Sequence, residues 1–102
     1  MNSEEYLLIV AMEESAELAQ EISKGLRFGM DNYHPDAINQ MPNTYRIIDE
    51  FYQLQSVIRG LQETGTLPSA SGDMAANLWS DKTNKVERYA EISRGLGILK
   101  DE

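Results

Sequence analysis

The chain has 102 residues, a net charge of −8 and no cysteine. This length and an apolar content of 41% predict one globular domain over residues 1–102. The lack of cysteine excludes disulfides and thiolate metal sites, and the single histidine, His34, cannot form a histidine-based zinc site alone. Any bound metal would therefore be held mainly by oxygen atoms, which favours magnesium or manganese.

The charge and hydropathy also bear on location and partners. Uniform negative charge disfavours binding to nucleic acid, and no apolar run is long enough to span a bilayer. Acidic residues occupy the N-terminal region, where a signal peptide would carry positive charge. We therefore expect a cytoplasmic protein with no nucleic-acid or membrane partner. The same acidity also has a simpler explanation, because it keeps a small protein in solution.

The first helix is expected to begin at Ser3, as its N-terminal cap, and to end near Lys24. Gly25, Gly29 and residues 31–42 have the composition of a loop. The first helix carries apolar residues at helical spacing: Leu7, Leu8, Ala11, Leu18 and Ile22.

A second helix is expected from a cap at Asn43 or Thr44 to about Leu61. Its apolar stripe comprises Ile47, Phe51, Leu54, Ile58 and Leu61. A third helical segment is expected from a cap at Asp73 to Arg94, as one helix or two. No strand-type alternation stands out, so the predicted fold class is all-α.

Acidic residues of the first helix lie beside its apolar stripe. At about 100° per residue, Glu14 falls at the edge of the face that contains Leu18. Glu17 and Glu21 border the same side, and Glu13 points further round. Two interpretations remain open at this point: a solvated flank paired with Lys24, or part of a cation site.

Glu50 is more informative, because it falls inside the apolar face of the second helix. Burying an unpaired carboxylate costs several kcal/mol unless a cation, a partner or a proton compensates. Glu14 and Glu50 stand at equivalent positions, four residues before Leu18 and Leu54. If the two helices pack face to face, their carboxylates would converge, and a divalent ion would relieve the repulsion.

These residues resemble a known family. Glu13-Glu14-Ser15-Ala16-Glu17, followed after a loop by Glu50 and a polar residue three positions later, resembles the E-E-x-x-E and E-x-x-D elements of the MazG-like all-α nucleoside triphosphate pyrophosphohydrolases. The segments 23–29 and 82–99 also look like small members of that group. The resemblance covers most of the chain in the family's order, and implies a helical bundle completed by oligomerisation.

The resemblance implies a magnesium-dependent enzyme that cleaves a nucleoside triphosphate into the monophosphate and pyrophosphate. Carried over by position, the metal ligands would be Glu14, Glu17, Glu50 and Gln53. Glu13 or Asp49 would position or deprotonate the attacking water. Phosphate contacts would come from Lys24, Arg27 and Lys85, and the base would face Phe28 or Tyr89. The family implies Mg²⁺ or Mn²⁺, a nucleotide ligand, and a homodimer or homotetramer.

One position departs from the family pattern. The aspartate of E-x-x-D is Gln53 here, which removes a negative charge from the expected metal site, with Asp49 or Glu21 as possible compensation. Three hypotheses follow: an active pyrophosphohydrolase, a nucleotide-binding protein of the same fold with little or no turnover, and a ligand-free helical interaction domain.

Overall fold

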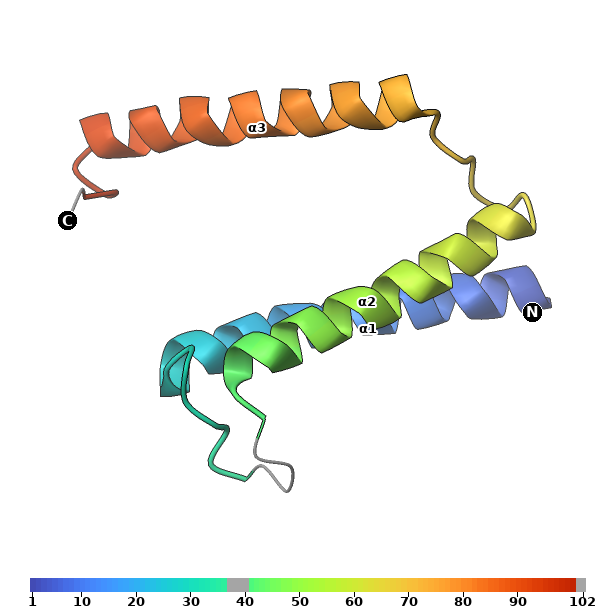
Figure 1. Ribbon diagram of the computed structural model, residues 1–102, viewed down its shortest axis with the longest axis horizontal. Helices are drawn as coiled ribbons and strands as arrows, with labels where there is room; N and C mark the ends of the chain where they lie inside the picture. Colours follow the sequence, from blue (N-terminus) through green and yellow to red (C-terminus); the bar gives the residue numbers. More distant parts are fainter. Residues whose placement is uncertain (37–40, 101–102) are drawn as a thin grey trace. The chain divides into compact units, whose positions relative to one another are not determined.

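The computed structural model describes residues 1–36 and 41–100, and these form an all-α structure without β-strands (Figure 1). The three helices are α1 (Ser3–Phe28), α2 (Asn43–Glu63) and α3 (Gly72–Gly95). The predicted fold class is confirmed at this level. The chain divides into two compact units, Met1–Pro68 and Ser69–Glu102, which are described separately below. The single domain expected over residues 1–102 stays a prediction.

Helix α1 is longer at its C-terminal end than the sequence predicted. The cap is Asn2 rather than Ser3, because the Asn2 side chain accepts a hydrogen bond of 2.8 Å from the Glu5 amide. The helix continues through Gly25, which was expected in the loop, and ends at Phe28, where Gly29 follows with a φ of 100°. Positive φ is a conformation that glycine adopts without strain, so Gly29 rather than Gly25 is the helix terminator.

Gly25 has a packing role inside α1. A Cβ atom at this position would lie 2.6 Å from Met30 Sδ and 3.5 Å from Ile47 Cδ1. The lack of a side chain therefore lets α2 and the following loop approach the α1 backbone closely. This is why the glycine lies within a helix, where it would otherwise be unfavourable.

The loop between the helices holds the start of α2 through backbone hydrogen bonds. The Asn43 and Thr44 amides donate to the carbonyl groups of Asn32 and Met30, at 2.9 and 3.0 Å. Asn43 was predicted as a possible cap, but it is the first residue of α2 and fully buried, and its side-chain amide donates to the Gly29 carbonyl at 2.8 Å. Residues 37–40 of the predicted loop lie outside the described residues.

Helices α1 and α2 pack against one another as an antiparallel hairpin (Figure 1). Their contact surface, termed the seam, follows two interleaved series in each helix with a spacing of seven residues, as in a coiled coil. On α1 the seam residues are Leu7, Ala11, Glu14, Leu18, Glu21 and Gly25, and on α2 they are Asn43, Ile47, Glu50, Leu54, Val57 and Leu61. All twelve are buried or half-buried, so three glutamates occupy central positions of a helix–helix contact.

The seam corrects three sequence-based placements. Glu14 was placed at the edge of the apolar stripe, but it lies on the line that joins Leu7 and Glu21 in the middle of the contact. Ile22 and Phe51 were assigned to the buried stripes, yet they are 42% and 43% exposed. The physical reason is that one partner helix covers only a narrow strip, whereas the apolar residues of each helix spread over a wider arc.

Several further apolar side chains form a second surface, termed the apolar face. It is half-buried or exposed and comprises Leu8, Ile22 and Leu26 of α1, with Ile48, Phe51 and Ile58 of α2. At about 100° per residue, these positions lie roughly 60–140° from the middle of the seam in the same rotational sense. In an antiparallel pair this places them on one side of the hairpin. Glu13, Glu17 and Asp49 turn in the opposite sense, so the acidic residues occupy the other side.

The second unit consists of α3 and its flanking residues. Ser71, rather than Asp73, caps α3, since its hydroxyl accepts from the Met74 amide at 3.2 Å. The helix runs without interruption to Gly95, which answers the question of one helix or two. No helix in residues 1–36 and 41–100 combines the length and apolarity that crossing a membrane requires.

Candidate metal centre

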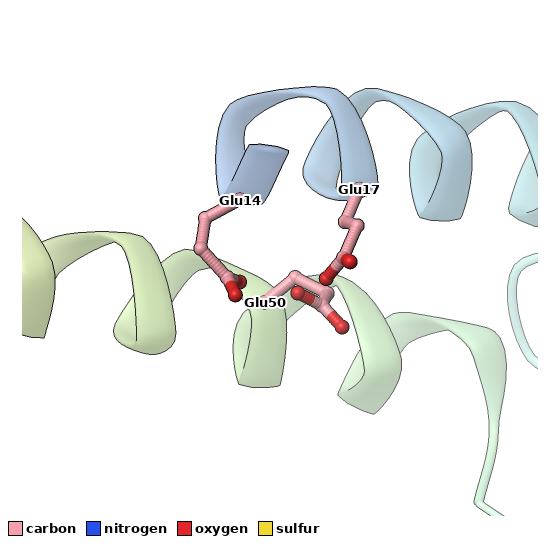
Figure 2. Close-up of side chains that lie close together, drawn as sticks. All are labelled: Glu14, Glu17 and Glu50. Atoms are coloured by element: carbon pink, nitrogen blue, oxygen red, sulfur yellow. The ribbon is translucent and has the colours of Figure 1, made fainter. Parts of the chain in front are cut away.

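Three carboxylates converge at the middle of the seam, as Figure 2 shows. Glu14 and Glu17 come from successive turns of α1, and Glu50 points toward them from α2. One oxygen of each lies within 4.8 Å of one oxygen of the other two. The expected convergence of acids from separate helices is therefore present. We call these three residues the carboxylate triad.

No ion pair from residues 1–36 or 41–100 balances the triad. Within residues 1–36 and 41–100, the recorded ion pairs involve Glu21 and none involves Glu14, Glu17 or Glu50. Glu14 and Glu50 are half-buried, and each has a buried Oε2 atom without a hydrogen-bond partner. Buried polar atoms are nearly always partnered in native structures, so these two oxygens indicate a missing proton, water or cation.

The environment of the triad raises the pKa of Glu50. Burial raises the pKa of Glu50 from 4.5 to about 7. The carboxylates of Glu14 and Glu17 contribute to the shift, because they repel a further negative charge and favour a proton between the groups. A divalent cation would act in the opposite direction, since it stabilises all three carboxylates in the ionised form.

Glu21, which the sequence placed on the same acidic flank, has a different environment. It is only 8% exposed, and it pairs with Lys24 Nζ at 3.4 Å and with Arg46 Nε at 3.5 Å. The pairing with Lys24 was foreseen as part of a solvated flank, but Glu21 is buried in the seam. Arg46 was missed altogether, because an ion pair across 25 residues leaves no periodic signal in the sequence.

The two residues expected to handle the attacking water lie outside the triad. Glu13 and Asp49 are exposed, on the acidic side of the hairpin. Gln53, expected as a fourth ligand, is also exposed, and its Nε2 donates to Asp49 Oδ2 at 3.0 Å. These three roles stay predictions.

The residues expected to bind substrate fall into two groups. Lys24, Arg27 and Phe28 lie on the last two turns of α1, where the Arg27 guanidinium is 5.2 Å from the centre of the Phe28 ring. Lys85 and Tyr89 are exposed on α3, in the second unit. The structure therefore brings Lys24, Arg27 and Phe28 into the hairpin that carries the triad, and the roles of all five stay predictions.

Comparisons with known proteins identified no relative. No family model, no curated protein and no solved structure matches the chain. The resemblance to the MazG-like enzymes therefore depends on the residues quoted from the sequence.

The raised pKa of Glu50 gives a pH-dependent contribution to stability with a defined sign. Below about pH 4.5 the group is protonated in both the folded and unfolded chain. Between pH 4.5 and 7 the unfolded chain releases this proton while the folded chain keeps it, so stability falls as pH rises. We expect Glu50→Gln to gain stability over wild type across this window and to hold the gain above pH 7.

The measurement is the free energy of unfolding in urea without divalent cations, at several pH values for both proteins. Glu63→Gln serves as the control, since Glu63 is an exposed acid at the end of the same helix. A constant difference between Glu50→Gln and wild type from pH 4.5 to 7 would contradict the assignment.

Proposed function

We propose that this chain is a cytoplasmic, magnesium-dependent nucleotide pyrophosphohydrolase of the MazG-like type. The observation that carries the proposal is the carboxylate triad. Two of its buried oxygens lack hydrogen-bond partners, and it has no ion pair with a cation of residues 1–36 or 41–100. The positions of Glu14, Glu17 and Glu50 in the two sequence elements that resemble the family support the same conclusion.

The donor set suits a hard divalent ion. Magnesium binds oxygen at about 2.1 Å, so two ligands across the ion stand up to about 4.2 Å apart. The triad oxygens, all within 4.8 Å of one another, need only small side-chain adjustments to reach that spacing. Manganese would accept the same ligands, since carboxylate oxygen suits both metals.

In the proposed reaction, water attacks the α-phosphorus of a nucleoside triphosphate, and the bond from that phosphorus to the bridging oxygen breaks. The products are the monophosphate and pyrophosphate. A bound magnesium ion would neutralise phosphate charge and make the water more acidic. Glu13 or Asp49, exposed beside the triad, would accept the proton of the attacking water. Lys24 and Arg27 would contact the phosphates, and Phe28 would face the base.

The test measures metal binding and turnover separately. Magnesium should raise the melting temperature of the wild-type protein, because a ligand that prefers the native state stabilises it. Pyrophosphate release should be detectable over a panel of nucleoside triphosphates with Mg²⁺ or Mn²⁺. Glu50→Gln should lower that rate by more than about 100-fold, since loss of even an outer partner of a metal ligand typically costs 10–100-fold.

Glu63→Gln again provides the matched control and should keep wild-type turnover. Absence of both a magnesium-dependent melting shift and pyrophosphate release in the wild-type protein would refute the proposal. It would favour the hypothesis of a ligand-free helical domain.

A second candidate is a nucleotide-binding protein with little or no turnover, and the environment of Gln53 favours it. The position that is an aspartate in the family carries no charge here. The Gln53 amide also donates a hydrogen bond to the carboxylate of Asp49, which is a candidate base. On this hypothesis the wild-type protein binds nucleotide with magnesium but releases no pyrophosphate, and Gln53→Asp gains activity. Wild-type turnover equal to that of Gln53→Asp would exclude it.

We further propose that the protein is a homodimer or homotetramer. Leu61 is the only large apolar side chain that is fully buried within residues 1–36 and 41–100. The apolar face of the hairpin remains exposed, with Leu26 at 75%. Exposed apolar side chains gathered on one side of a helix pair are typical of association sites. The apolar face lies opposite the acidic side, so association would leave the triad open to substrate.

The oligomer is tested by charge insertion. Leu26→Glu should shift the mass measured by analytical ultracentrifugation toward the monomer, because a charge in an apolar interface is left without compensation. Tyr6→Glu is the control, since Tyr6 is exposed on the other side of α1. A monomeric wild-type protein, or an unchanged mass for Leu26→Glu, would contradict the proposal.

A further inference from the structure

An ion pair between Glu21 and Arg46 lies one helical turn from the carboxylate triad. Glu21 follows Glu17 by four residues on α1, and Arg46 precedes Glu50 by four on α2. The contact between Glu21 and Arg46 is therefore displaced from the triad by about 6 Å along the hairpin. Lys24, the second partner of Glu21, lies on the same side of α1 as Glu17.

The contacts of Arg46 leave binding capacity unused. Its Nε lies 3.5 Å from Glu21 Oε2, longer than the roughly 2.7–2.9 Å of a strong charge-assisted hydrogen bond. Its Nη1 is buried with no acceptor, although the side chain as a whole is 30% exposed. A guanidinium carries five donors, so the exposed part of the Arg46 side chain can contact a second anion.

Glu21 can also release Arg46 without becoming an unpaired buried charge. Removing the only partner of a buried carboxylate is strongly unfavourable. Glu21 has two partners, and Lys24 Nζ remains at 3.4 Å from its other oxygen. An ammonium group has three donors, so Lys24 can hold Glu21 and contact a phosphate at the same time. Transfer of Arg46 from Glu21 to an incoming anion therefore leaves the acid compensated, which a simple two-residue ion pair would not allow.

We propose that Arg46, held by Glu21, binds the phosphate groups of a polyphosphate whose metal occupies the carboxylate triad. This role rests on the proposed function, since the triad supplies the metal that places the polyphosphate. The site then has two parts. The triad binds the cation, and Arg46 contacts phosphate oxygens one turn further along the hairpin, where the acids alone would repel them.

The test uses Mn²⁺ alone and then inorganic pyrophosphate with saturating Mn²⁺, both by isothermal titration calorimetry on the full chain. Arg46→Gln should bind Mn²⁺ like wild type and bind pyrophosphate about tenfold more weakly or worse, as expected for loss of a charge-assisted contact. Arg59→Gln, an exposed arginine on the same helix, is the matched control and should leave both affinities unchanged.

Glu21→Gln separates a binding role from a structural one. It frees Arg46, so pyrophosphate affinity should stay or rise, whereas a purely structural ion pair predicts the same loss as in Arg46→Gln. The inference is overturned if Arg46→Gln binds pyrophosphate like Arg59→Gln, or if it loses Mn²⁺ and pyrophosphate together. Absence of Mn²⁺ binding in wild type would instead refute the triad itself.

If Arg46→Gln fails to fold by circular dichroism, the double variant Glu21→Gln, Arg46→Gln replaces it, because removing both charges leaves no uncompensated group. That variant should retain Mn²⁺ binding and lose pyrophosphate binding. Wild-type affinity for pyrophosphate in the double variant would also overturn the inference.

Discussion

The meeting of Glu50 with Glu14 and Glu17 is the constraint on which the hairpin depends. These carboxylates occupy positions of, or next to, a helix–helix contact that would otherwise hold apolar side chains. Their repulsion opposes the packing of α1 on α2 unless a proton or a cation is bound. Burial and this repulsion together raise the pKa of Glu50 to about 7. Stability and ligand binding are thus linked through the same few atoms.

The hairpin handles its buried acids in two ways. The negative charge of Glu21 is paired with Lys24 and Arg46, so this part of the seam needs no external cation. Glu14 and Glu50 have no such ion pair within residues 1–36 and 41–100, and each has a buried oxygen without a hydrogen bond. Glu21 Oε2 also has no hydrogen bond, but it lies 3.5 Å from Arg46 Nε. A purely structural arrangement would be expected to compensate all of them, because an uncompensated buried charge is strongly destabilising. Because Glu21 has ion pairs and the triad has none, a site for an external cation explains the triad better than a purely structural role.

The shape of the hairpin separates two surfaces with different chemistry. Acidic residues face one side, where Asp49 and Gln53 are hydrogen-bonded to each other, and apolar residues such as Leu26 face the other. A two-helix contact buries too little apolar surface for a small chain to rely on it alone. Association through the apolar face would supply the missing burial while the acidic side stays accessible to a charged ligand.

Much of this arrangement follows from the sequence because helical periodicity is a local property. The spacing of apolar residues predicted that the chain is helical, and it placed Glu50 among them. It predicted the convergence with Glu14 on the condition that the two helices pack face to face, and the family resemblance added Glu17. Helix ends were less well defined, since a capping residue is selected by the conformation of one or two peptide units. Asn2 and Ser71 therefore replaced the expected caps Ser3 and Asp73.

Only the tertiary structure determined which buried acid has a cationic partner and which does not. The partner helix covers a strip narrower than the arc over which the apolar residues of each helix spread. Glu14 therefore lies in the seam, and Phe51 lies outside it. The register between the helices, with Gly25 allowing close approach, brought Arg46 to Glu21 rather than to Glu50. Such contacts depend on the relative position of two helices, and no pattern within either helix encodes that position.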